Sequence, residues 1–142
     1  MNYPLQKSTY FSGGGGLCST LYDYAILLQM FLNNGEYNGV RLLSRNTVRM
    51  ITENQIGDLH PGIGDNSAHT EFGFGFAIVS EEGSRFGPSQ AGTYSWGGAF
   101  STSYWVDPKE DMIVLAYEQM WGPYVANTAK AFKPLVYQAI ND

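Results

Sequence analysis

Apolar residues near the start of the chain recur every three or four positions, the period of an α-helix packed on one side. Ser19 and Thr20 stand where a helix N-cap belongs, and Asp23 follows as the acidic partner of a capping box. The asparagines and glycines of "NNGEYNG" supply the left-handed conformations that end a helix. This pattern predicts a helix over residues 20–33. Its apolar stripe consists of Leu21, Ala25, Leu28, Phe31 and Leu32.

A second helix is predicted over residues 44–55. Ser44 provides its N-cap, and Val48 and Ile51 are spaced to face the core, with Met50 at their edge. The stretch that follows, "IGDLHPGIGDNSAHTE", has no apolar period and predicts a long polar loop.

The hydrophobic period changes to two at residue 72. In "FGFGFAIVS", large apolar residues alternate with glycine and alanine, which predicts one strand with a small-residue face. "STSYWVD" and "DMIVLAYEQM" are typical of strands, the second of a buried one, and "PKED" between them is typical of a turn. Strands between about residues 72 and 119 are therefore expected to form an antiparallel meander of three or four strands.

The last predicted element is a helix over residues 123–140, with Pro123 in its first turn. Pro134 falls in its middle, where a proline is expected to kink or restart the helix. The apolar face of this helix consists of Val125, Ala129, Phe132, Val136 and Ile140.

Helices followed by an antiparallel sheet and a final helix define an α+β fold, with the helices packed on the sheet. We expect residues 1–142 to form a single domain. The C-terminal helix would cover one sheet face, and the early helices only part of the other. Such an open aromatic face is typical of an interface and favours self-association. Its expected members are Phe72, Phe74, Phe76, Tyr94, Tyr104 and Trp105.

Composition narrows the classes of partner. The net charge is −5 and the 8 Lys and Arg residues are scattered, so we expect no nucleic-acid partner. No apolar run approaches the roughly 18 residues of a membrane span, and we expect a soluble chain. Cys18 cannot form an intrachain disulfide alone and is expected to be a small buried residue, which leaves the cellular compartment open.

The histidines and clustered carboxylates of the chain could bind a metal, but their positions favour contact with solvent instead. His60 and His69 lie nine positions apart in the polar loop without a ligand-spacing motif, so we expect them to be exposed to solvent. Asp107, Glu110 and Asp111 surround a predicted turn, where carboxylates usually contact water. We therefore expect no metal and no cofactor.

Three stretches of the chain together resemble a known family. These are "SGGGGLCSTLYDYAILLQMFLNNGEYNGVRLLSRNTVRMITENQ", then "FGFGFAIV", then "YSWGGAFSTSYWVDPKEDMIVLAYEQM". They are similar to the C-terminal portion of the serine β-lactamase-related family, which includes class C β-lactamases, penicillin-binding DD-peptidases and esterases. The resemblance covers about residues 12–140 and implies the C-terminal part of a β-lactamase-like catalytic domain, whose full length is commonly more than twice this chain.

The resemblance implies acyl transfer, in which the serine of an S-x-x-K motif attacks a carbonyl. No serine in this sequence has a lysine three residues later, and no tyrosine is followed by the asparagine of Y-x-N. Ser44-Arg45-Asn46 matches an S-x-N variant but coincides with the predicted cap of the second helix. We therefore expect no catalytic residue in this chain.

The family's third motif, usually K-T-G, corresponds to Trp96-Gly97-Gly98, as in esterase-type members. The resemblance then implies that the backbone N–H of Ala99 is one of two oxyanion-hole donors. Without the lysine, a neutral ester or amide is favoured over a carboxylate-bearing β-lactam. The glycines would leave room for an acyl group, and a β-bulge is the structural alternative.

Three hypotheses follow from these observations. The chain is the C-terminal portion of a serine hydrolase for an ester, amide or β-lactam and is inactive alone. Alternatively it is a non-catalytic binding module that assembles as an oligomer. Thirdly, it acts only when joined to a missing N-terminal portion or to another chain that carries S-x-x-K.

Overall fold

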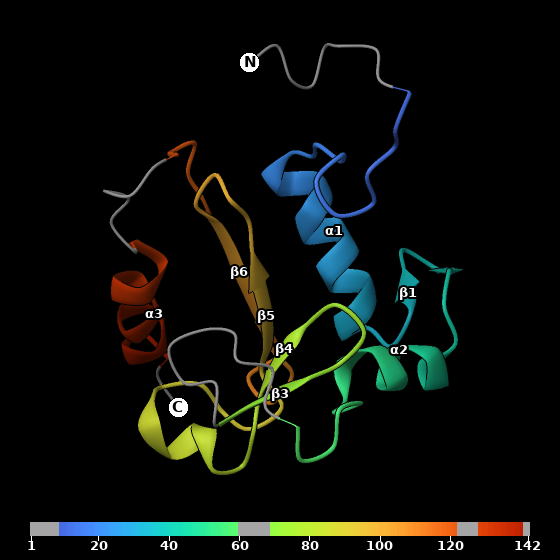
Figure 1. Ribbon diagram of the computed structural model, residues 1–142. Coiled ribbons are helices and arrows are strands. Elements are labelled where there is room, and N and C mark those ends of the chain that lie inside the picture. The colour runs from blue at the N-terminus through green and yellow to red at the C-terminus, as the bar shows by residue number, and fades with distance from the viewer. Residues whose placement is uncertain (1–8, 60–68, 122–127, 141–142) are drawn as a thin grey trace.

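The computed structural model describes residues 9–59, 69–121 and 128–140, and its elements are antiparallel strands with helices on both sides (Figure 1). The helices are α1 (Leu21–Leu32), α2 (Arg45–Thr52), a 3-10 helix (Gly83–Phe86) and α3 (Thr128–Gln138). The strands are β1 (Glu36–Tyr37), β2 (Val40–Arg41), β3 (Thr70–Phe72), β4 (Ala77–Val79), β5 (Tyr94–Gly97), β6 (Thr102–Asp107) and β7 (Met112–Tyr117). The five strands β3 to β7 form one antiparallel sheet in chain order, which confirms the α+β class and the antiparallel meander. The predicted number of three or four strands is too low, because the segment from residue 72 contributes to two strands.

Local capping explains where the first two helices begin. The Thr20 hydroxyl accepts the Asp23 N–H at 3.1 Å and donates to the Asp23 carboxylate at 2.8 Å. Ser44 accepts the Thr47 N–H at 3.1 Å, so its role as a helix cap is as predicted. α2 ends at Thr52, three residues before the expected end, because Glu53 has an extended backbone.

The strand predicted from residue 72 is instead the hairpin of β3 and β4, in which Phe72 pairs with Ala77. Gly75 has a φ of +104°, which only glycine adopts readily and which turns the chain back on itself. The four alternating apolar residues therefore do not share one face. Phe76 and Ile78 are buried, whereas Phe74 is 58% exposed.

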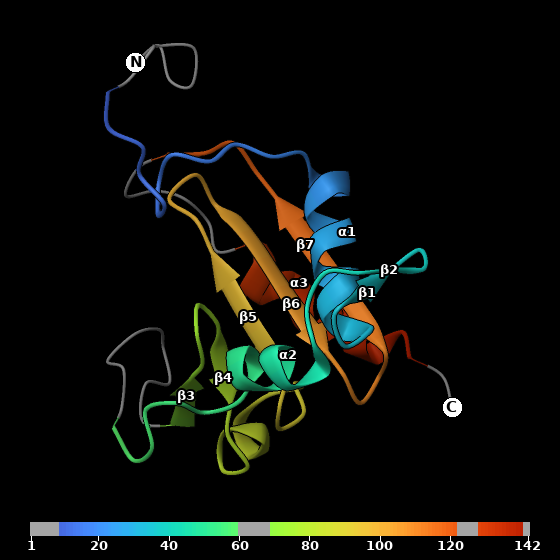
Figure 2. The same cartoon turned by 90° about the vertical axis from the view of Figure 1, so that its right-hand side faces the viewer.

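The core lies between α1 and one face of the sheet. Phe31 of α1 packs edge-on against Phe76 with ring centroids 5.4 Å apart, and Tyr24 lies 5.0 Å from Tyr104. Figure 2 shows α1 and α2 in front of the sheet and α3 behind it. The buried members of this core are Leu28, Phe76, Ile78, Tyr94, Tyr104 and Val106.

The predicted open aromatic face is therefore wrong as a description of the sheet. Four of its six proposed members, Phe76, Tyr94, Tyr104 and Trp105, are buried. The first three face α1, and Trp105 faces α3, because successive residues of a strand point to opposite sides of the sheet. Burial raises the pKa values of Tyr94 and Tyr104, as expected for hydroxyls removed from water.

α3 is attached to the sheet by polar contacts. Its Tyr137 hydroxyl donates to the Asp107 carboxylate at 2.6 Å, and its Lys133 ammonium lies 5.1 Å from the centre of the Trp105 ring. The helix continues through Pro134, so the predicted restart is not observed; contacts to the sheet lie on both sides of the proline. The predicted start of this helix, including Pro123 and Val125, lies outside the described residues.

Asp107 differs most from its prediction. It is fully buried and accepts four hydrogen bonds, from the side chains of Thr93 and Tyr137 and from the backbone N–H groups of Lys109 and Glu110. The turn sequence indicated a carboxylate in water, but α3 covers this end of the hairpin. Asp107 therefore anchors α3 and the β6–β7 turn together.

Two further predictions can be compared with the structure. Cys18 is exposed rather than buried, and it lies in the segment without regular secondary structure before α1. Among the residues that the structure describes, no helix is long and apolar enough to cross a membrane.

Candidate functional site

In the described part of the chain, no strand pairs with the outer edge of β5 at the Trp96-Gly97-Gly98 motif. β4 pairs with β5 only as far as Ser95, through the pairs Ala77 with Ser95 and Ile78 with Tyr94. The Gly98 N–H donates to the Thr102 carbonyl of the β6 side at 2.8 Å. Because backbone groups of neighbouring strand residues point in opposite directions, the N–H and C=O of Gly97 face away from β6. They lie beyond the end of β4, where a substrate could pair with them.

A tight turn follows at Gly98 to Ser101. The Ser101 N–H donates to the Gly98 carbonyl at 3.1 Å, and Ser101 has a φ of +65°. Ala99 is exposed at the first central position of this turn, and no acceptor for its N–H lies in the described part of the chain. The N–H that the resemblance implies as an oxyanion donor is therefore available.

Both glycines lie where a Cβ would collide with Thr102 across the hairpin: at Gly97 with its backbone, at Gly98 with its side chain. A Cβ at Gly97 would lie 2.8 Å from the Thr102 carbonyl oxygen, and one at Gly98 would lie 2.5 Å from the Thr102 hydroxyl. The register runs without interruption from Tyr94 with Val106 to Gly97 with Ser103, so the alternative of a β-bulge at the glycines is wrong. The predicted role of the two glycines, leaving room for an acyl group, stays a prediction.

Aromatic side chains border the turn on two sides. Trp96 is 37% exposed and packs edge-on against Phe72, with ring centroids 5.2 Å apart. Phe100 packs at 5.1 Å against Trp121, which is 71% exposed. The Met120 N–H donates to the Phe100 carbonyl at 3.2 Å and fixes this second pair beside the turn. The wall formed by residues 96–100 is thus apolar and uncharged.

Sequence reasoning did not identify the Phe100–Trp121 pair. Phe100 directly follows Ala99, but Trp121 lies beyond β7, and only the β6–β7 hairpin brings it back to the turn. The position of Trp121 just after the last predicted strand was the one sequence feature that could have indicated this pair.

The described histidine and carboxylate candidates are not among the residues that contact the wall formed by residues 96–100. His69 is half-buried rather than exposed; its ring stacks on Phe86 at 4.6 Å, and its Nδ1 lies 3.5 Å from the Glu82 carboxylate. His60 lies outside the described residues. Asp111 is exposed as predicted, whereas Glu110 is half-buried and accepts from the Gln90 amide. Within residues 9–59, 69–121 and 128–140, no group of three or more His, Cys, Asp or Glu side chains could hold a metal ion.

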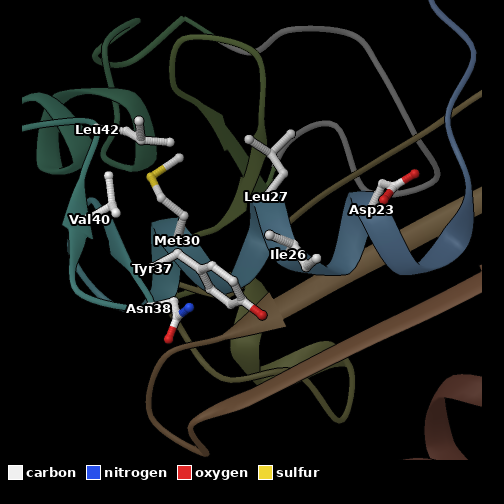
Figure 3. A pocket seen from close by; sticks show the side chains of 8 residues that line it. All are labelled: Asp23, Ile26, Leu27, Met30, Tyr37, Asn38, Val40 and Leu42. Carbon is white, nitrogen blue, oxygen red and sulfur yellow. The ribbon is translucent and has the colours of Figure 1, made fainter.

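A separate hollow of about 400 Å³ lies between α1 and the β1–β2 hairpin (Figure 3). Apolar side chains from both elements line most of it, among them Leu27, Met30, Val40 and Leu42. None of the residues 96–99 contributes to its lining, so this hollow is distinct from the candidate site.

The fold is shared with a solved hydrolase. The structure superposes on EstCE1, a hydrolase with promiscuous acyltransferase activity, with a TM-score of 0.53 and 21% sequence identity, over 82% of this chain and 28% of that one. This likeness shows that the two proteins share a fold. The family model for Beta-lactamase matches residues 2–133, and the chain belongs to this family.

Two curated relatives fit this assignment. Protein Rv1367c of Mycobacterium tuberculosis (strain ATCC 25618 / H37Rv) is 34% identical over 114 residues, which are 75% of this chain and 28% of the relative. A putative D-alanyl-D-alanine carboxypeptidase of Escherichia coli O157:H7 is 40% identical over 63 residues, which are 42% of this chain and 14% of the relative. The chain thus spans less than a third of the length of the relatives that it matches.

Proposed function

We propose that this chain is the C-terminal part of a serine hydrolase catalytic domain, that it supplies the oxyanion-binding wall, and that it is catalytically inactive alone. The observation that carries this proposal is the Ala99 N–H, which has no acceptor in the described part of the chain and lies beside the β5 edge that β4 leaves unpaired. The chain belongs to a family of acyl-transfer enzymes, yet its sequence has neither S-x-x-K nor Y-x-N.

The outer edge of the sheet supports the idea that further polypeptide completes the domain. Among the residues that the structure describes, β7 is the last strand of the sheet and pairs only with β6. Its sequence, "MIVLAY", is a continuous apolar run of the kind found in strands covered on both faces. Unprotected apolar edges are rare in stable folds, because they recruit other strands. A strand from outside this chain would extend the sheet at β7.

In the completed domain, a serine from the missing portion would attack the substrate carbonyl. The carbonyl carbon becomes tetrahedral, and its oxygen takes up negative charge beside the Ala99 N–H. Such a donor stabilises the transition state by about 3 kcal/mol when it is held in place, as the turn at Gly98 to Ser101 would hold it. The second donor would be the N–H of the attacking serine.

The wall favours a neutral substrate. Residues Trp96 to Phe100 include no cation that could hold a substrate carboxylate. Trp96 and the Phe100–Trp121 pair instead offer apolar surface on either side of the turn. An ester or amide with an uncharged acyl group is therefore the proposed substrate class, ahead of β-lactams.

The proposal is tested by removing only the Ala99 N–H. We expect that joining this chain to the N-terminal portion of EstCE1 gives an active fusion, and that Ala99→Pro lowers its kcat for nitrophenyl acetate by about 100- to 1000-fold. Proline is favoured at the first central position of such a turn, so the fold should survive the change. Ala99→Gly keeps the N–H and is expected to stay within a few-fold of the parent fusion. Equal activity of the Pro and Gly variants would contradict the role of this donor.

A further inference from the structure

Lys133 lies on the side of α3 that faces the sheet. Its ammonium is 5.1 Å from the centre of the Trp105 ring, and that ring is almost completely buried. Lys133 is itself half-buried, and its amine lies between the helix and the face of the Trp105 ring. Nothing in the proposed hydrolase chemistry uses this group.

The Lys133 amine has no ionic or hydrogen-bonding partner in the described part of the chain. The ion pairs found there join Arg41 to Glu36 and Arg49 to Glu53. Asp107 is the nearby carboxylate, but its oxygens already accept four hydrogen bonds from other groups. The attraction between the ammonium and the ring face of Trp105 offsets only part of the free energy that removing the charge from water costs.

These surroundings favour the neutral amine. Burial lowers the pKa of Lys133 to about 8, against a smaller opposing effect of the Asp107 charge. At pH 7.5 a group with this pKa is neutral in roughly a quarter of the molecules, whereas an ordinary lysine is neutral in about 0.1%. A desolvated lysine of this kind is a known form of activated nucleophile.

We propose that Lys133 is a site of covalent acylation, at which its amine accepts an acyl group from activated esters or chemically equivalent acyl donors. The neutral amine nitrogen attacks the carbonyl carbon and forms the C–N bond. The bond from that carbon to the leaving-group oxygen breaks, and the alcohol or phenol departs as its anion. The nitrogen gives up one proton to solvent, and a neutral amide remains on the side chain. No other reactant is needed.

Two lysines of this chain serve as internal controls. Lys130 lies one turn earlier on α3 and Lys109 lies in the β6–β7 turn, and both are exposed. They are more accessible to a reagent than Lys133, so simple accessibility predicts that they react faster. If the neutral amine decides reactivity, Lys133 reacts faster than both exposed lysines.

The test treats the chain with nitrophenyl acetate at pH 7.5 and locates the acetyl groups by peptide mass spectrometry. Lys133 is expected to be labelled about 3-fold faster than Lys109 or Lys130, because its larger neutral fraction outweighs the lower intrinsic reactivity of a weaker base. Its labelling rate should rise with pH and reach half its maximum near pH 8. The label should resist hydroxylamine, because it is an amide rather than a serine ester.

A pair of variants completes the test. Lys133→Arg keeps a cation over Trp105 but has no nucleophilic amine, so the fast labelling should disappear. Lys130→Arg should leave it unchanged. Equal labelling rates of Lys109, Lys130 and Lys133 in the unaltered chain would overturn the proposal. This measurement does not depend on the folding of any variant. So would a fast label that persists in Lys133→Arg or is released by hydroxylamine.

Discussion

Replacing Asp107 by asparagine is expected to lower the free energy of unfolding by about 2–3 kcal/mol. One carboxylate oxygen accepts from Thr93 and Tyr137, and the other accepts from the backbone of Lys109 and Glu110. An asparagine side chain has only one accepting oxygen, and its NH2 group would face donors on the other side. Either the backbone donors of the turn or the Thr93 and Tyr137 hydroxyls then lose their acceptor, and the donors that lose it stay buried.

Urea unfolding followed by circular dichroism measures this effect. Asp111→Asn is the matched control, because Asp111 is exposed in the same turn. Its φ of +50° is one that asparagine adopts readily. The control should change stability by no more than about 0.5 kcal/mol. Similar losses for the two variants would show that Asp107 is not the buried anchor described here.

Alanine at Gly97 is expected to cost about 2–3 kcal/mol through overpacking in the hairpin. The new Cβ would lie 2.8 Å from the Thr102 carbonyl oxygen, which is held by its hydrogen bond to the Gly98 N–H. Backbone on both sides of the contact must move to relieve it. Gly87→Ala is the control, since no atom lies within 4 Å of a Cβ at that position.

Gly98→Ala tests a side-chain contact with Thr102, whereas Gly97→Ala tests a backbone contact with the same residue. The Cβ at Gly98 would meet the Thr102 hydroxyl at 2.5 Å, so removing that hydroxyl with Thr102→Ala should rescue Gly98→Ala. The same second substitution should not rescue Gly97→Ala, whose contact is with backbone. The coupling is read from urea unfolding of the single and double variants. Rescue of both glycine variants, or of neither, would contradict the geometry of this hairpin.

The helix ends were predictable because their signals are local. Thr20 with Asp23 and Ser44 with Thr47 form caps within one turn of chain, and the structure shows both. The hairpin at Gly75 was missed because an alternating pattern of aromatic residues and glycines fits a straight strand as well as a turn. Only the positive φ of Gly75 separates the two.

Long-range contacts account for the other errors. Asp107 was expected in water because its neighbours form a turn, but Tyr137 reaches it from 30 residues away. The aromatic face of the sheet was expected to be open because sequence does not say how fully α1 covers it. Both features depend on where helices pack, and a single sequence carries no direct record of that.

The candidate site was found through the resemblance rather than through periodicity. Trp96 to Ala99 were identified as a motif, and the structure places them at the point where β4 stops pairing with β5. The open edge could not be predicted, because it depends on the β3–β4 hairpin that sequence reasoning missed. The reason for the glycines also became visible only with Thr102 across the hairpin.

The inactivity of this chain alone is tested most directly by nitrophenyl acetate in large excess at neutral pH. After the first equivalent, which Lys133 is expected to consume, nitrophenolate release should be no faster than from the same chain unfolded in urea. Sustained release over many equivalents, abolished by a serine-directed phosphonate, would contradict the claim that the nucleophile lies outside these residues.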